Sequence, residues 1–173
     1  MPVEKLGTHP PRVLIADDND ANRGILSRLL GRRGYSVFEA ESGERALDMI
    51  DEVAPDMVLL DLNMPDLSGI EILRQIRRTQ DSSMLPVIMV TAEHDNEMIA
   101  RCLGAGANDY VTKPVQWAVL QARIETHLSL HRAHAELLHD RDRLEASIVQ
   151  RAHLITRIDQ VLQHQREQAL VKP

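Results

Sequence analysis

The sequence predicts an α/β fold built on a parallel sheet. From residue 12 onward, short apolar runs alternate with longer amphipathic segments, which is the pattern of repeated βαβ units. Polar residues that can carry chemistry lie where several of these runs end. The last segment, residues 115–172, contains neither Gly nor Pro, which favours one long helix.

The length and composition are those of a folded protein with room for one compact domain, or for a domain plus an extension. Of the 173 residues, 43% are hydrophobic, which is ample for a core, and the net charge of −6 argues against broad nucleic-acid binding. No apolar stretch approaches 18 residues and no secretory leader begins the chain, so we expect neither a membrane span nor secretion. We therefore expect a cytoplasmic protein. The single cysteine, Cys102, excludes an intrachain disulfide and is expected to be a packed thiol in a helix.

Three regions are expected along the chain. Residues 1–11 carry prolines and a glycine without periodicity and are interpreted as a flexible leader. Residues 12–128 should form the α/β domain, and residues 129–173 a helical extension. The predicted strands are 12–16, 35–39, 57–60, 86–90 and 109–111, with a helix after each.

Several helix ends are marked by local sequence. Ser68-Gly69-Ile70-Glu71 has the S-x-x-E form of a capping box, so a helix should start at Ser68. Other expected N-caps are Asn19 or Asp20, Ser42, and Asp95. Gly34 and Gly104 suit the positive φ that ends a helix.

The long last segment should use two different apolar faces. A helix over residues 115–172 would be about 85 Å long, which is too long to be stable alone. Its first half should pack on the sheet through Leu120, Ile124 and Leu128. Its second half carries an imperfect heptad, with Ile148, Ile155, Leu162 and Ala169 at one core position and Leu144, Arg151, Ile158 and Gln165 at the other. We favour parallel or antiparallel pairing with a second helix, giving a homodimer, over a solvated and frayed tail.

The strand ends carry a set of residues with related chemistry: Asp17, Asp18, Asp61, Thr91 and Lys113. In an open parallel sheet, ligands bind outside the carboxyl ends of the strands. Three crowded carboxylates repel one another, and a hard divalent cation such as Mg²⁺, with Mn²⁺ as a substitute, relieves that repulsion. A neutral hydroxyl and a compact positive charge beside them could hold a phosphoryl group, with Asp61 as the nucleophile. Each residue alone has an ordinary structural alternative, such as a helix cap, a turn or a solvated loop charge.

Taken together, the motifs resemble a known family. They are Val13-Leu14-Ile15-Ala16-Asp17-Asp18, Leu59-Leu60-Asp61-Leu62-Asn63-Met64-Pro65 followed by Gly69, Val90-Thr91-Ala92, and Gly106-Ala107-Asn108-Asp109-Tyr110-Val111-Thr112-Lys113-Pro114. Over residues 12–128 the chain resembles the receiver domain of two-component response regulators. The resemblance implies a flavodoxin-like five-stranded sheet of order 2-1-3-4-5 with helices on both faces.

The resemblance also implies a phosphorelay function. Asp61 would accept a phosphoryl group from a histidine kinase or a histidine phosphotransfer protein. Mg²⁺ would be bound by Asp18, Asp61 and the backbone carbonyl of Asn63, and Asp17 would act mainly through metal-bound water. Lys113 would pair with the phosphoryl oxygens.

Switching and dephosphorylation roles are implied in the same way. Thr91 would hydrogen-bond the phosphoryl group and Tyr110 would move into the space that Thr91 vacates, which together make the switch. Asn63 and Glu93 would tune dephosphorylation. The expected output is a shift of the surface that is coupled to the C-terminal helix.

Two alternatives remain open. The chain could be the regulatory fragment of a larger enzyme, such as a nucleotide cyclase, a cyclic-dinucleotide phosphodiesterase or a phosphatase, because the long helix looks like a connector. A haloacid-dehalogenase-type phosphatase is a remote alternative, since Asp61-Leu62-Asn63 lacks the second acid of the D-x-D pattern. We expect a signalling receiver that is not itself an enzyme, apart from promoting its own phosphorylation and dephosphorylation. No helix-turn-helix break or basic recognition face indicates a DNA-binding output.

Overall fold

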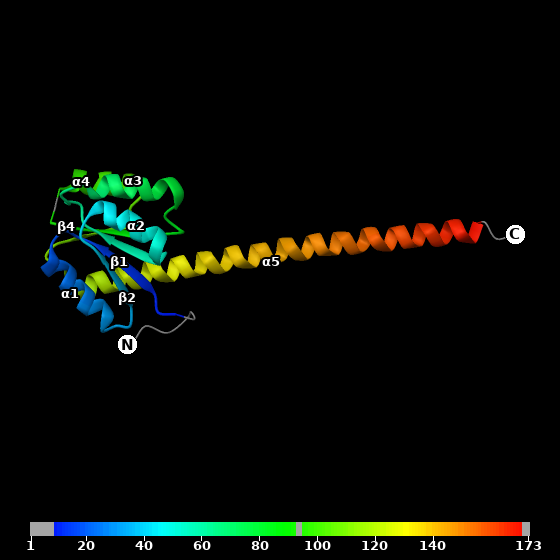
Figure 1. The fold of residues 1–173 in the computed structure, drawn as a ribbon, viewed down its shortest axis with the longest axis horizontal. Coiled ribbons are helices and arrows are strands. Elements are labelled where there is room, and N and C mark those ends of the chain that lie inside the picture. The colour runs from blue at the N-terminus through cyan, green and yellow to red at the C-terminus, as the bar shows by residue number, and fades with distance from the viewer. Residues whose placement is uncertain (1–8, 93–94, 171–173) are drawn as a thin grey trace. The chain divides into compact units, whose positions relative to one another are not determined.

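The computed structural model describes residues 9–92 and 95–170, without the side chains of residues 152, 154–156 and 158–170. It contains a five-stranded parallel sheet of order β2-β1-β3-β4-β5, which confirms the predicted fold class (Figure 1). The strands are β1 Arg12–Ala16, β2 Ser36–Ala40, β3 Met57–Leu60, β4 Val87–Thr91 and β5 Asp109–Thr112. The helices are α1 Asp20–Gly31, α2 Gly43–Val53, α3 Gly69–Thr79, α4 Asn96–Gly104 and α5 Trp117–Leu170.

The order of the strands reverses at β1. This strand pairs with β2 on one side and with β3 on the other, and its last residue, Ala16, lies opposite both Ala40 and Leu60. The residues that follow β1 and β3 therefore leave the sheet side by side. An open α/β sheet binds its ligands at such a switch point.

Alternating residues of the strands build two cores, one on each face of the sheet. Leu14 belongs to the core under α2, α3 and α4, whereas Val13 and Ile15 belong to the core under α1 and the start of α5. The predicted contact of the last helix with the sheet is confirmed: Leu120 and Ile124 are fully buried and Leu128 is nearly so. Cys102 is buried in α4 as expected.

The predicted N-caps are confirmed. Ser68 and Glu71 form both halves of a capping box at α3. The other three N-caps are Asn19 for α1, Ser42 for α2 and Asp95 for α4.

One predicted helix end is wrong. Gly104 is the last residue of α4, and the positive φ occurs two residues later, at Gly106 with φ 103°. Ala105 continues the right-handed turn because its N–H bonds to the carbonyl oxygen of Arg101. Gly34 does have a positive φ, 90°. Thr91 is the last residue of β4, so this strand runs one residue further than predicted.

The chain divides into two compact units, Met1–Arg132 and Ala133–Pro173. The first contains the sheet with its helices, and the second contains the later part of α5. The proposed boundary at residue 128 stays a prediction, and most of the proposed leader lies outside the described residues. In the described part of the chain, no helix has both the length and the apolar character needed to cross a membrane.

Candidate functional site

Backbone hydrogen bonds hold the candidate residues at one end of the sheet. The N–H of Asp61 donates to the carbonyl of Ala16 at 2.8 Å, so the residue after β3 stays beside the end of β1. The N–H of Lys113 donates to the carbonyl of Thr91 at 2.8 Å. The parallel register therefore gathers chain segments that are far apart in sequence.

Three carboxylates come together at this end. Asp17, Asp18 and Asp61 each offer one oxygen atom, and these atoms lie within 4.8 Å of one another. Asp17 and Asp61 are buried, whereas Asp18 is exposed. A set of hard oxygen donors with one side open to water fits Mg²⁺, which prefers oxygen ligands and keeps several waters.

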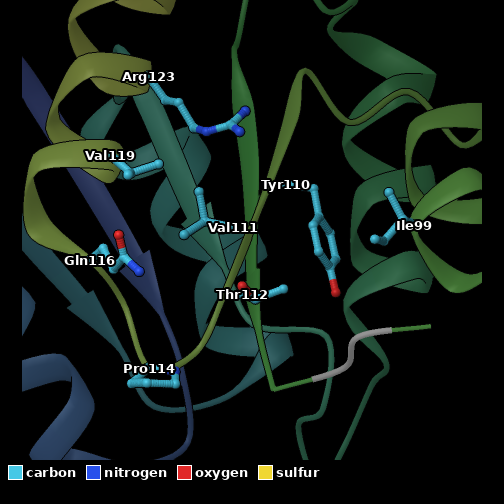
Figure 2. Close-up of a pocket in the computed structure, with 8 residues that line it drawn as sticks. All are labelled: Ile99, Tyr110, Val111, Thr112, Pro114, Gln116, Val119 and Arg123. Atoms are coloured by element: carbon cyan, nitrogen blue, oxygen red, sulfur yellow. The ribbon is translucent and has the colours of Figure 1, made fainter. Parts of the chain in front are cut away.

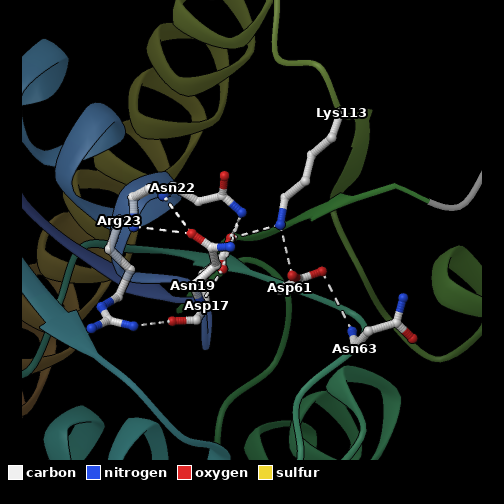
Figure 3. Close-up of polar contacts among 8 residues, drawn as sticks. Asp17, Asn19, Asn22, Arg23, Asp61, Asn63 and Lys113 are labelled. Atoms are coloured by element: carbon white, nitrogen blue, oxygen red, sulfur yellow. Dashed lines mark hydrogen bonds and ion pairs between the residues drawn. The ribbon is translucent and has the colours of Figure 1, made fainter.

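Lys113 bridges the two buried carboxylates. Its Nζ lies 2.6 Å from Oδ2 of Asp17 and 2.7 Å from Oδ2 of Asp61 (Figure 3). Burial lowers the pKa of Lys113, but the hydrogen bonds and charges of the two carboxylates outweigh it, so the pKa is raised. The ammonium group therefore stays charged and offsets the repulsion between the acids.

Asp17 receives further donors from the N-cap and first turns of α1. Its Oδ1 accepts the N–H of Asn19 at 2.9 Å, and the amide of Asn22 lies 3.3 Å from Oδ2 (Figure 3). The guanidinium of Arg23 donates to the backbone carbonyl of Asp17 at 2.6 Å. Protein donors thus occupy both carboxylate oxygens, an arrangement that suits an indirect contact to a metal through water.

Sequence reasoning did not find Asn22 and Arg23 as neighbours of the site. The sequence does contain an indication of their place. Both residues lie about one helical turn after Asn19, the N-cap of α1, which itself follows the acidic pair Asp17-Asp18. Residues in the first turns of a helix after a strand lie over the end of that strand.

The loop after Asp61 is closely packed. The N–H of Asn63 points to Oδ1 of Asp61 at 3.4 Å, and the N–H of Gly69 donates to the carbonyl of Leu62 at 2.8 Å. A Cβ atom on Gly69 would lie 2.2 Å from the carbonyl oxygen of Asp61, a distance that no packed structure tolerates. Glycine is therefore required where α3 begins.

The proposed switch residues lie on β4 and β5. Thr91 is fully buried, and Tyr110 is 8% exposed. Tyr110 also lines a cavity of about 330 Å³ between α4 and α5, shown with its other lining residues in Figure 2. Glu93 lies outside the described residues. The structure thus brings Asp17, Asp18, Asp61 and Lys113 into one cluster and places Thr91 at the neighbouring strand end.

Comparison with known families agrees with this geometry. Residues 13–125 match the family described as the response regulator receiver domain. The chain belongs to this family. A CheY-like receiver domain from Methanospirillum hungatei has a similar structure, with a TM-score of 0.68, 29% identity, and coverage of 72% of this chain and 98% of that one.

Similar curated proteins are longer than this receiver chain. The transcriptional regulatory protein AfsQ1 of Streptomyces coelicolor is 44% identical over 114 residues, which are 66% of this chain and 49% of that protein. A probable cyclic di-GMP phosphodiesterase of Vibrio cholerae is 35% identical over 146 residues, 84% of this chain and 33% of that protein. The chain therefore spans about half or less of the length of these relatives.

Proposed function

We propose that this receiver is a phosphorylation-dependent response regulator and that Asp61 is its phosphoacceptor. The supporting observation is the contact between Asp61 and Lys113, which places a fixed positive charge beside a buried carboxylate at the switch point of the sheet. In the proposed reaction, an oxygen of Asp61 forms a bond to phosphorus while the phosphorus–nitrogen bond of a phosphohistidine breaks. The leaving imidazole keeps the electron pair and takes up a proton. The donor is a histidine kinase or a histidine phosphotransfer protein.

Asp18, Asp61 and the backbone carbonyl of Asn63 would hold Mg²⁺, or Mn²⁺ in its place. The bound ion supplies neutralisation of the charge that the phosphoryl group carries. Asp17 keeps its protein donors and contributes through water. Lys113 remains available to the phosphoryl oxygens because it already lies against Asp61.

Thr91 and Tyr110 form the proposed switch. Phosphorylation adds about −1.5 to −2 charges, so a nearby hydroxyl gains from turning toward the new oxygens. Thr91 is buried at the end of β4, directly paired with Thr112 two residues after Tyr110. A movement of Thr91 is therefore transmitted over a short path to Tyr110. Asn63 and Glu93 are proposed to tune the access of the water that removes the phosphoryl group.

A second candidate concerns the larger protein. The match to the Vibrio phosphodiesterase covers 146 residues, which is longer than the receiver region 13–125 and includes part of the long helix. This likeness favours a receiver that regulates an enzyme through α5, while the receiver itself acts in signalling. We further propose that α5 joins two copies of the chain. The coding sequence downstream of residue 173 tests whether an enzymatic domain follows.

The phosphoacceptor proposal is tested by incubating the protein with acetyl phosphate and Mg²⁺ and measuring its intact mass. The wild type should gain one labile phosphoryl group, and Asp61→Ala should gain none. An unmodified wild type, or equal uptake by the variant, would overturn the proposal.

A further inference from the structure

The second unit of the chain exposes large apolar side chains in a regular pattern. Leu137, Leu144 and Ile148 are 70%, 65% and 66% exposed on α5. They are separated by seven and four residues, the spacing of two d positions followed by an a position in a heptad. We call these three residues the helix seam. Most helical stability in proteins comes from packing of an apolar face, so such a seam calls for a partner helix.

We infer that the partner is the helix seam of a second copy, paired in parallel and in register. This inference rests on the dimer in the proposed function and adds its orientation. Leucine at d combined with isoleucine at a favours parallel two-stranded coiled coils. The chain has leucine at d in Leu137 and Leu144 and isoleucine at a in Ile148 and Ile155, whereas Arg151 interrupts the d positions after Leu144.

The charges near the seam fit this arrangement. Arg141 occupies an a position and contacts Asp142 at 3.0 Å and Glu145 at 3.8 Å in its own helix. In a parallel pair, Asp140 of the second copy, at position g, flanks the same layer. The Arg141 side chains of the two copies would therefore lie among acidic side chains, which offsets the repulsion between the two arginines. A polar residue at an a position also fixes the register at some cost in stability.

Parallel pairing has a consequence for signalling. It places the N-terminal ends of both α5 helices, and hence both receivers, at the same end of the pair. Phosphorylation of either receiver then acts on the same end of one helical pair. An antiparallel pair would separate the two inputs.

Single cysteines in the full-length protein test the orientation. In a parallel pair in register, identical d residues face each other closely enough for a disulfide, whose Cα atoms lie within about 7 Å. Leu144→Cys should therefore cross-link to itself under mild oxidation. Ala146→Cys, two residues along on the outer face, is the matched control and should stay uncross-linked. The native Cys102 is fully buried and is present in both variants.

Each outcome either supports or overturns the parallel pair. Selective cross-linking at residue 144, together with a dimer by light scattering, supports the inference. A monomer, equal cross-linking at both positions, or a dimer without cross-linking at residue 144 overturns it. Labelling of the same samples with acetyl phosphate reports on the proposed function independently. Uptake without parallel pairing refutes the inference but not the phosphoacceptor, and a monomer also refutes the proposed α5 dimer. Pairing without uptake refutes only the phosphoacceptor.

Discussion

Lys113 Nζ lies 2.7 Å from Oδ2 of Asp61, and the same nitrogen lies 2.6 Å from Asp17. One ammonium group therefore bridges two buried carboxylates that follow different strands and offsets part of their charge. Lys113 directly follows β5, so this contact ties the end of β5 to the ends of β1 and β3. A divalent cation bound at the site would offset part of the same negative charge that Lys113 offsets.

Lys113→Ala should destabilise the metal-free protein. Removal of a charged hydrogen-bond donor from two buried acids costs about 2 kcal/mol of the free energy of unfolding. Mg²⁺ should stabilise the variant more than the wild type, because the freed carboxylates bind it without competition. Urea unfolding with and without Mg²⁺ measures both effects. Lys113→Arg keeps the charge and serves as the control. An unchanged unfolding free energy in Lys113→Ala without Mg²⁺ contradicts this account.

Gly69→Ala should destabilise the protein and slow phosphoryl uptake. The new Cβ atom would meet the carbonyl oxygen of Asp61, so the loop after β3 must shift. Gly24→Ala is the matched control, since Gly24 lies inside α1 and a Cβ atom added there would have no neighbour within 4 Å. It should stabilise the protein by about 0.5–1 kcal/mol through helix propensity. Thermal unfolding and acetyl phosphate labelling distinguish the two variants, and equal effects would argue against a tight contact at Gly69.

Thr91→Ala should separate phosphorylation from its structural consequence. The variant keeps Asp61 and Lys113, so it should still take up a phosphoryl group. It lacks the hydroxyl that is proposed to turn toward that group. Hydrogen exchange of peptides covering Tyr110 and the start of α5 should change on phosphorylation in the wild type and in Thr91→Ser, but not in Thr91→Ala. An identical response in all three proteins rules out Thr91 as the switch.

Asp109 should contribute stability that depends on pH. Burial raises its pKa, but hydrogen bonds from Arg123, the backbone of Tyr110 and His127 outweigh this effect, so the pKa of Asp109 is lowered. A lowered pKa gives stability that is complete above the unfolded-state pKa of about 3.9 and is lost as pH falls through the native value. Asp109→Asn should therefore cost about 1–2 kcal/mol at pH 7 and progressively less below pH 4.

Unfolding free energies at pH 7, 5 and 3 test this dependence. Asp51→Asn, at an exposed position on α2, is the control and should show little difference from the wild type at any pH. A deficit in Asp109→Asn that stays constant from pH 7 to pH 3 would argue against the charged contact with α5.

The sequence carried enough information to predict the cluster but not all of its supports. Asp61 and Lys113 were predictable because parallel strands bring their carboxyl ends to one edge. Asn22 lies in the first turn of α1 after the acidic pair, which indicates a place near the end of β1, but its contact with Asp17 depends on how α1 packs on the sheet. The same holds for Asp66, which accepts N–H bonds from Gly43 and Glu44 across two elements.

The wrong helix end at Gly104 has a different cause. Gly104 and Gly106 are equally suited to a positive φ by residue type. The side chain of Arg77 contacts the position where a Cβ would lie on Gly106, and its Nε donates to the Gly106 carbonyl at 2.8 Å. This long-range contact, rather than the local sequence, distinguishes the two glycines.

Chemical trapping identifies directly which residue carries the phosphoryl group. Borohydride reduces an aspartyl phosphate to homoserine, which peptide mass mapping can locate. After treatment with acetyl phosphate and Mg²⁺, the account predicts homoserine at residue 61 and unmodified aspartate at residues 17 and 18. Homoserine at another residue with Asp61 intact would contradict it.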